Sequence, residues 1–429
     1  MNHFPNKIHF IGIGGVGMSG LAFIMSAHGY IVSGSDMADS ETIAMLRTAG
    51  ITITLGHDPE NIPQGNDILI VRTSAISEDN IEYLAAFHRG LRIILRGRML
   101  AELATMYKCV IAVSGTHGKT SVTALLVHIL KAAGLEPGYM IGGKVQSWTR
   151  NASQGDLGIF VTESDESDGT QVYLKPNILL VTNIEDDHSW TLGGEEVLYE
   201  NFKRIATASE YLIYGNNEIA KELFSFHPKQ EMINYSDETL IAKIRPRWGE
   251  FQISNAQIAY QAARHIGISS DIIMNALKDF TGVERRMSIR YESNNVVLIE
   301  DYAHHPTEIK AAICAIKKNY SNYKLKIIFQ PHRYARLEKY FEKFANELAC
   351  ADEIFITPVF AAWSETGKLN SSDLANAIGE KASCLTGTFE DSAKIALKKV
   401  EKKEVIAIFG AGDIQEIVPF CISILKDKN

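Results

Sequence analysis

The chain is poor in cysteine, with five among 429 residues. The cysteines are dispersed, and no C-x-x-C pair or other spacing typical of metal sites occurs. This excludes a cysteine-based metal cluster. Three of them, Cys109, Cys314 and Cys350, lie in apolar or helical contexts, so we expect buried thiols in a reducing compartment.

Long apolar runs are also absent. No segment approaches the roughly 18 apolar residues that a membrane span needs. The first apolar run is short and interrupted by glycines, unlike a signal peptide. We therefore expect a cytoplasmic protein.

Positive charge is in deficit, with 43 Lys and Arg against 51 Asp and Glu, a formal net charge of −8. This argues against nucleic acid or an anionic membrane as the main partner. A local basic pocket for an anionic substrate stays compatible with it. The composition, 46% hydrophobic and 22% charged, is typical of a globular protein, and the length indicates two or three domains.

The stretch from Cys109 to Lys131 is the most informative part of the chain. Its apolar, β-branched start predicts a strand, and its second half has helical apolar spacing. The loop between them, GTHGKT at 115–120, is shorter than the G-x-x-x-x-G-K-[ST] pattern. We interpret it as a phosphate-binding loop for ATP, with Lys119 at the terminal phosphates and Thr120 on Mg²⁺. The alternative is an ordinary strand–turn–helix connection.

A second glycine motif lies near the N-terminus. Gly12, Gly14 and Gly17 form G-x-G-x-x-G between a predicted strand and a predicted helix, and Asp36 follows the next strand. This is typical of a dinucleotide-binding βαβ unit. Nothing downstream supplies hydride chemistry, so another pyrophosphate nucleotide fits as well as NAD. The loop 73–76 also follows a strand, and a ligand-binding role and a polar turn are about equally supported.

Two acidic clusters, at 163–168 and 183–188, each follow a predicted strand of the second domain. Both should lie at the sheet edge that carries the phosphate loop, where carboxylates can hold Mg²⁺ beside ATP. Most members of such clusters are solvated loop residues. Glu163 and His188 are the best candidates because each closely follows a buried strand.

Polar clusters also follow the predicted strands of the last third. His304 and His305 could form a metal pair, but neighbouring loop residues seldom point the same way, so helix-start and substrate roles are preferred. Arg333 and Arg336 lie three apart at a helix start, which suits a carboxylate ligand. Residues 282–286 are a possible hinge whose arginines either reach phosphates or lie on the surface.

Together these motifs resemble the Mur ligases. The resemblance rests on segments 12–18, 115–120, 163–168, 183–188, 301–308 and 330–336 and runs over nearly the whole chain. It is greatest to members that join L-alanine to UDP-N-acetylmuramate. Members that ligate a murein tripeptide differ around 330–336.

The resemblance implies an α/β protein of three domains. These are a Rossmann-like UDP-sugar-binding domain at 1–105, a central P-loop ATPase-type domain at 106–285 and a Rossmann-like amino-acid-binding domain at 286–429. It implies ATP-dependent amide-bond formation through an acyl phosphate, for peptidoglycan synthesis, with Mg²⁺ as cofactor. UDP-N-acetylmuramate and L-alanine are the expected small-molecule partners, without nucleic acid or membrane. A monomer or weak homodimer is expected.

The resemblance also implies roles for individual residues. The UDP-sugar set is Gly14, Gly15, Val16, Gly17, Met18, Ser35, Asp36, Thr73 and Ser74. The ATP set is Gly115, Thr116, His117, Gly118, Lys119, Thr120, Asn255, Arg286 and Asp301. The amino-acid set is Tyr302, Arg333 and Arg336. The metal set is Thr120, Glu163 and His188, and catalytic roles fall to Lys119, His304 and Arg333.

The chain departs from the family pattern around ATP. Asp186 and Trp190 replace a proline and an aspartate of the second-metal motif, and Ser254 and Ile258 replace a histidine and an asparagine near the adenine. The alternatives are therefore a Mur-type ligase with another amino acid or a peptide as acceptor, and a catalytically silent UDP-sugar-binding paralogue. An NAD oxidoreductase is disfavoured by the ATP loop.

Overall fold

Three separate β-sheets organise the chain. The computed structural model describes residues 4–166, 169–187, 189–234, 240–293, 295–362 and 366–428. Within them every strand pair is parallel except β7–β8 and β13–β14. The predicted three-domain α/β architecture is confirmed, and the limits proposed at residues 105 and 285 stay predictions.

The first sheet has the strand order β3-β2-β1-β4-β5, with β1 in the middle. Its strands are β1 (Lys7–Ile11), β2 (Ile31–Asp36), β3 (Thr52–Leu55), β4 (Ile68–Arg72) and β5 (Arg92–Leu95). Its helices are α1 (Val16–Ala27), α2 (Glu41–Thr48), α3 (Ile81–His88) and α4 (Arg96–Ala104), with the 3₁₀ turn η1 (Pro59–Asn61). The order reverses direction at β1, so the loops after β1, β2 and β4 share one edge.

The middle sheet has the order β12-β11-β10-β6-β9-β7-β8. Its strands are β6 (Cys109–Ser114), β7 (Gly138–Met140), β8 (Ala152–Ser153), β9 (Ile159–Glu163), β10 (Ile178–Val181), β11 (Tyr211–Gly215) and β12 (Gln230–Ile233). Its helices are α5 (Lys119–Ala132), α6 (Ser189–Leu192), α7 (Glu195–Thr207), α8 (Glu218–Phe224), α9 (Leu240–Ile244), α10 (Glu250–His265) and α11 (Ser270–Asp279), with the 3₁₀ turn η2 (Thr170–Val172). β10 is ILLV and entirely buried, as expected for a parallel strand covered on both faces.

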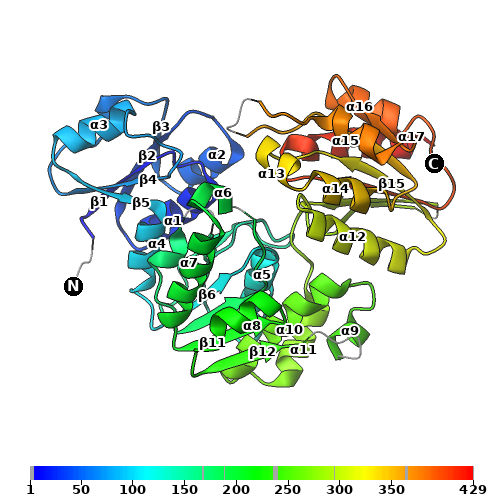
Figure 1. Cartoon of the computed structure of the whole chain (residues 1–429). Coiled ribbons are helices and arrows are strands. Elements are labelled where there is room, and N and C mark those ends of the chain that lie inside the picture. The colour runs from blue at the N-terminus through cyan, green and yellow to red at the C-terminus, as the bar shows by residue number, and fades with distance from the viewer. Residues whose placement is uncertain are drawn as a thin grey trace. The chain divides into compact units, whose positions relative to one another are not determined.

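The third sheet has the order β13-β14-β18-β15-β16-β17. Its strands are β13 (Ser288–Glu292), β14 (Val296–Asp301), β15 (Lys324–Phe329), β16 (Glu353–Ile356), β17 (Ala382–Cys384) and β18 (Glu404–Phe409). Its helices are α12 (Pro306–Asn319), α13 (Tyr334–Lys339), α14 (Phe341–Leu348), α15 (Ser371–Ile378), α16 (Phe389–Ala396) and α17 (Val418–Lys428), with the 3₁₀ turn η3 (Asp413–Ile417). Helices α16 and α17 cover one face of the sheet, and α12 and α14 cover the other (Figure 1). The antiparallel edge strand β13 was not predicted from the sequence.

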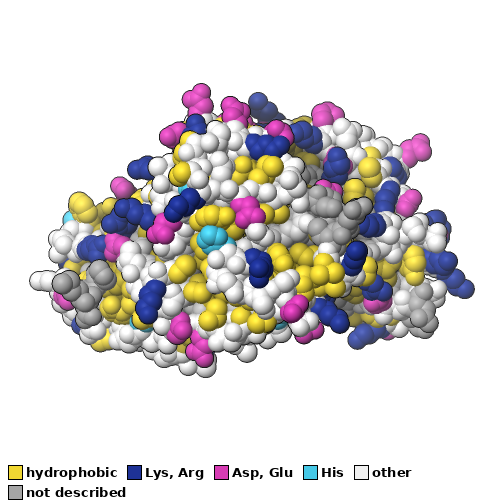
Figure 2. Space-filling model, turned by 90° about the horizontal axis from the view of Figure 1, so that it is seen from below, with side chains coloured by type: hydrophobic (Ala, Val, Ile, Leu, Met, Phe, Trp, Pro, Cys, Tyr) yellow, Lys and Arg dark blue, Asp and Glu magenta, His cyan; other side chains and the backbone are white. Residues whose placement is uncertain are grey.

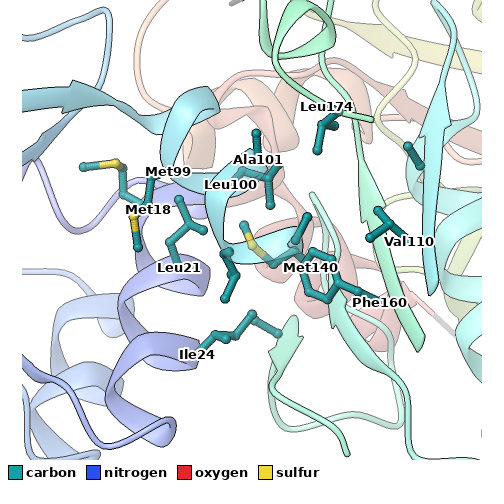
Figure 3. Close-up of a cluster of buried hydrophobic side chains, with 14 of the residues drawn as sticks. Met18, Leu21, Ile24, Met99, Leu100, Ala101, Val110, Met140, Phe160 and Leu174 are labelled. Carbon is teal, nitrogen blue, oxygen red and sulfur yellow. The ribbon is translucent and has the colours of Figure 1, made fainter. Parts of the chain in front are cut away.

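The three sheets fall into two compact units. Unit 1 is Met1–Ile244 with Ser254–Thr281 and contains the first two sheets, and unit 2 is Arg245–Ile253 with Gly282–Asn429 and contains the third. The first two sheets share one hydrophobic cluster (Figure 3). In it Met18 and Leu21 of α1 and Met99 of α4 lie with Met140 and Phe160 of the middle sheet. This shared core explains why two sheets make one unit.

The expectation of buried thiols is wrong for two of the three cysteines named above. Cys314 and Cys350 are exposed, and Cys109 is partly buried. Cys314 lies in α12, where its neighbours Ile313 and Ala315 turn inward, so its apolar context did not mean a buried position.

The surface agrees with the modest net charge. Figure 2 shows both acidic and basic side chains, interspersed with apolar ones, on the face in view. No helix among the described residues is long and apolar enough to cross a membrane.

We predict that Phe160→Ala will lower the free energy of unfolding by about 3–5 kcal/mol, because Phe160 is fully buried between the first two sheets. Urea titration followed by circular dichroism measures the change. Phe87→Ala is the matched control: that ring is 61% exposed and its loss should cost less than about 1 kcal/mol. Equal effects of the two changes would contradict the shared core.

Candidate functional site

The phosphate loop lies unusually close to the segment after β10. Gly115 has φ +120°, and a Cβ there would stand 2.8 Å from the Asn183 carbonyl oxygen and 2.9 Å from the Thr182 nitrogen. Gly118 has φ +86° and caps the N-terminus of α5. Both positions therefore require glycine, one for space and one for its left-handed backbone.

Hydrogen bonds hold the loop against that segment. The Thr116 amide donates to the Asn183 carbonyl at 3.0 Å, and the His117 amide donates to Asn183 Oδ1 at 3.0 Å. Thr182 Oγ1 donates to the His117 carbonyl at 2.5 Å, and the Glu185 amide donates to Thr116 Oγ1 at 2.9 Å. The loop is thus held before any ligand arrives.

Lys119 opens α5 and points back across its own loop. Its Nζ donates to the Gly115 carbonyl at 2.7 Å and to Glu166 Oε2 at 2.8 Å. Burial opposes the charge of Lys119, but Glu166, Asp165 and Glu163 outweigh it and raise the lysine pKa. Burial raises the pKa of Glu166 to about 7, although Lys119 opposes the shift. A permanent cation therefore stands at the loop.

Thr120 and Glu163 lie together, as predicted for a metal pair. Thr120 Oγ1 donates to Glu163 Oε2 at 3.1 Å, and Glu163 also accepts from the Gly142 amide. Burial raises the pKa of Glu163, so a bound cation would stabilise its charged form. Hydroxyl and carboxylate oxygens are the donors that Mg²⁺ prefers, so the pair fits that ion. The third predicted ligand, His188, lies outside the described residues.

Asn255, predicted near the adenine, lies against the phosphate loop. A Cβ on Gly118 would stand 2.5 Å from Asn255 Oδ1. Asn255 is buried on α10, and Ile258, one turn further on, is buried as well. The face of α10 that carries Asn255 thus borders the first turn of α5.

The first glycine loop is assembled in the first domain as the motif requires. The Gly14 amide donates to Asp36 Oδ2 at 2.8 Å, and a Cβ built on Gly12 would lie 3.6 Å from Ile76 Cγ1. Thr73 Oγ1 accepts from the Ala75 amide at 3.1 Å and shapes the loop after β4. The loops after β1, β2 and β4 therefore meet at one edge. Val16 and Met18 begin α1, where Met18 is buried and Val16 exposed.

Ser35, predicted to bind the UDP-sugar, has a buried side chain. Its Oγ donates to Glu82 Oε2 at 2.5 Å. Glu82 has no exposed surface and also accepts from Asn61 Nδ2 and from the Asp58 amide, the latter at 3.2 Å. Burial opposes the charge of Glu82, but these donors and His9 overcome it and lower its pKa to about 2.

Glu82 was not predicted, because nothing in a sequence marks one helical glutamate as buried. It belongs to α3, yet it accepts hydrogen bonds from Ser35 in β2 and from Asp58 and Asn61 after β3, so it ties the helix to two neighbouring strands at this edge. Glu166 was also missed, although it lies in the acidic cluster that the sequence singled out.

In unit 2, Tyr302 and His304 follow β14, as predicted. His304 Nδ1 lies 3.1 Å from Glu308 Oε2. The rings of Tyr302 and His304 meet edge to face, with their centroids 5.3 Å apart. Arg286 lies 4.9 Å over the Tyr302 ring and 3.6 Å from Glu308 Oε1. His305 caps α12, which confirms its helix-start role.

Both carboxylate oxygens of Asp301 accept hydrogen bonds from main-chain amides. It accepts from the Met287 and Ala303 amides, each at 2.7 Å. Burial nevertheless raises its pKa to about 6. The carboxylate therefore fixes the path of the chain on both sides of β14.

Arg333 and Arg336 begin α13, as predicted, but their surroundings differ. Arg336 is 1% exposed, and its Nη1 lies 3.2 Å from His332 Nδ1. Arg333 has a backbone φ of +68°, which is strained for a residue other than glycine. Its amide donates to the Phe360 carbonyl at 2.8 Å. His332 stacks on Phe360 at 5.4 Å. Strain of this kind is typical of functional sites.

Family models match the chain in three consecutive stretches. The Mur ligase family catalytic domain matches residues 7–108, the Mur ligase middle domain residues 113–258, and the Mur ligase glutamate ligase domain residues 285–412. The chain belongs to the Mur ligase family.

Two curated relatives that are similar over nearly their full length carry the same activity in their names. UDP-N-acetylmuramate–L-alanine ligase of Legionella pneumophila is 34% identical, over 96% of this chain and 95% of the relative. The ligase of the same name from Aquifex aeolicus is 34% identical over 99% and 98%.

Solved structures of Mur ligases share the fold over the whole chain. UDP-N-acetylmuramate-alanine ligase of Thermotoga maritima superposes with a TM-score of 0.81 at 27% identity, covering 99% of this chain and all of that one. A murein peptide ligase of Psychrobacter arcticus has a TM-score of 0.67 at 22% identity over 98% of each chain. At this identity, the similarity to the murein peptide ligase supports a shared fold and not a shared activity.

We predict that Gly115→Ala will abolish detectable ATP binding in calorimetry, because the new Cβ collides with the segment after β10 and displaces the loop. Gly134→Ala is the control. Gly134 has φ +78° at the end of α5 with open space around it, so that change adds only backbone strain, about 1 kcal/mol. ATP binding that survives Gly115→Ala would show that the loop tolerates displacement.

We predict that Glu82 stabilises the first domain in a pH-dependent way. Its folded pKa of about 2 lies below its ordinary value of 4.5, so its contribution is complete above pH 4.5 and is lost as the pH falls through 2. The stability of the wild type relative to Glu82→Gln should therefore shrink by about 3 kcal/mol between pH 7 and pH 2. Urea titrations at several pH values measure it.

The control for that series is Glu78→Gln, because the Glu78 side chain is 75% exposed. Its difference from the wild type should hardly change with pH. A pH-independent difference for Glu82→Gln would mean that the carboxylate is not held in its charged form.

Proposed function

We propose that this protein joins L-alanine to UDP-N-acetylmuramate with hydrolysis of ATP to ADP and phosphate. The observation that carries the proposal is the assembled group of Lys119, Thr120 and Glu163 at the phosphate loop. Relatives at 34% identity over nearly the full length are named for this activity.

The reaction needs ATP because a carboxylate is a poor electrophile. The carboxylate of the muramyl group attacks the γ-phosphorus, the bond to the bridging oxygen breaks, and ADP leaves. The alanine amine then attacks the acyl phosphate carbon. The tetrahedral intermediate expels phosphate, and the amine loses its surplus proton. Catalysis of such a transfer is mostly positioning and neutralisation of charge.

The chain supplies these functions from the phosphate loop. Lys119 balances the charge that develops on the γ-phosphate, and the main-chain amides at the start of α5 bind phosphate oxygens. Lys119 Nζ already donates to the Gly115 and Thr116 carbonyls and to Glu166, which uses all three of its N–H groups, so it must give up one of these bonds to bind phosphate. Thr120 and Glu163 would hold Mg²⁺, which supplies further charge neutralisation when bound.

The amino acid belongs to unit 2 in this proposal. Arg333 and Arg336 bind its carboxylate, and Tyr302 and His304 border the reacting amine. Arg286 and Asp301 serve ATP from the same unit. The buried position of Arg336 gives its guanidinium a fixed direction, which suits bidentate recognition.

The first domain binds the UDP-sugar. The loop Gly14–Met18 takes the diphosphate, and Asp36 and the residues Thr73 and Ser74 lie at the uridine. Ser35 acts indirectly, because its hydroxyl is committed to Glu82. A cytoplasmic location and a monomer or weak homodimer remain predictions.

A second candidate is a ligase of the same type with another acceptor. The departures from the family pattern at Ser254 and Ile258, in the helix α10 that carries Asn255, leave room for such a divergence. They concern ATP rather than the acceptor, so L-alanine stays the first choice.

We predict that phosphate release will require UDP-N-acetylmuramate, ATP, Mg²⁺ and L-alanine together. It should fall by at least about 1,000-fold in Lys119→Ala, since a phosphate-loop cation is worth several kcal/mol to the transition state. A coupled phosphate assay with each of the twenty amino acids measures both activity and acceptor choice. Chelation of Mg²⁺ with EDTA should stop the release.

Lys131→Ala is the matched control, since Lys131 lies in the same helix and contacts Tyr139 and Trp148 instead of the loop. It should retain activity. Phosphate release with glycine or serine but not with L-alanine would mean that the acceptor is another amino acid. Binding of UDP-N-acetylmuramate without any release would favour the silent paralogue.

A further inference from the structure

The predicted UDP-sugar site lacks a positive side chain. Its nine residues are glycines, apolar or hydroxyl residues and Asp36, which is itself acidic. A sugar diphosphate carries negative charge on both phosphates. The positive end of α1 offsets only part of that charge, because a helix N-terminus carries about half an elementary charge. A nearby cation is therefore expected.

Arg96 stands beside the glycine loop. It is the first residue of α4, and a Cβ built on Gly17 would lie 2.7 Å from Arg96 Nη1 and 3.0 Å from its Cδ. Gly17 belongs to the first turn of α1. The guanidinium group thus covers the third glycine of the motif, where any larger residue would displace it.

Arg96 is held in place from the middle domain. Its Nη2 donates to Thr170 Oγ1 at 3.1 Å. The backbone at Gly97 also lies close to Thr170: a Cβ built on Gly97 would lie 2.8 Å from the same Thr170 oxygen. Thr170 is buried and begins η2, just beyond the acidic cluster. The side chain is therefore oriented before a ligand binds.

Arg72 ends β4 at the same edge, but its side chain is directed elsewhere. Its Nη1 donates to the Ile76 carbonyl at 2.6 Å, its Nη2 lies 3.4 Å from Glu78, and its guanidinium lies 5.0 Å over the Tyr83 ring. Arg72 stabilises the loop after β4 and does not cover the glycine loop.

We propose that Arg96 binds the diphosphate of the UDP-sugar, together with the amides at the start of α1. This inference rests on the proposed function. A planar guanidinium can give two parallel hydrogen bonds to a phosphate, which adds direction to charge. Because Thr170 orients it, the middle domain contributes to binding of the sugar nucleotide in the first domain.

The test measures binding and turnover in parallel. Calorimetry with UDP-N-acetylmuramate should show affinity reduced by about 10- to 100-fold in Arg96→Ala and by less in Arg96→Lys. The KM for the UDP-sugar should rise by a similar factor, while ATP affinity measured without the sugar stays unchanged. Thr170→Val keeps the shape but removes the acceptor, and about a 3-fold loss is expected.

Arg98→Ala is the matched control. Arg98 lies in the same helix, is 54% exposed and pairs with Glu102 at 2.8 Å. It should bind the UDP-sugar as the wild type does. Thermal unfolding of each variant establishes that it is folded. If Arg96→Ala does not fold, Arg96→Lys takes its place in the binding measurement.

Three results would overturn the inference. Arg96→Ala and Arg96→Lys that both bind like Arg98→Ala would show that Arg96 is structural, while the proposed function would stand. A wild type that does not bind UDP-N-acetylmuramate at all would overturn the proposed function and this inference with it. A loss confined to ATP affinity would likewise contradict a diphosphate role.

Discussion

The approach of the phosphate loop to the segment after β10 is the contact on which the candidate site depends. Gly115 lies so close to Thr182 and Asn183 that no side chain fits between them. The hydrogen bonds from Thr116 and His117 then fix the loop, and α5 starts immediately afterwards. Lys119 and Thr120 owe their positions to this arrangement, because each stands in the first turn of that helix.

Buried acids behave differently across the molecule, according to what surrounds them. Glu82 is surrounded by polar donors, which lower its pKa to about 2 despite complete burial. Asp301 accepts two main-chain bonds, yet burial prevails and raises its pKa to about 6. Glu166 faces the cation Lys119, and burial still raises its pKa to about 7. Glu82 therefore remains a charged acceptor that holds α3 to its neighbours, whereas the charge of Glu166 depends on Lys119 beside it.

Much of the fold could be predicted from the sequence. Strand β6 and helix α5 were predicted on either side of the phosphate loop, because an apolar, β-branched run and helical apolar spacing leave little choice of structure. The short edge strands β13 and β17 were missed, since exposed edge residues lack that pattern. Cys314 was misplaced for a related reason: one cysteine among apolar neighbours says little about which face of a helix it occupies.

By itself, the sequence determined that this chain has an ATP-type loop, a second glycine loop and arginines at a helix start. Each of these signals is local, because spacing within a few residues sets the backbone that binds a ligand. Only the tertiary structure decided that Glu82 ties α3 to β2 and to the segment after β3, that Glu166 pairs with Lys119, and that Arg96 covers Gly17. Those contacts join segments far apart in the chain, so no local pattern carries them. They depend on how parallel strands bring their carboxyl ends to one edge.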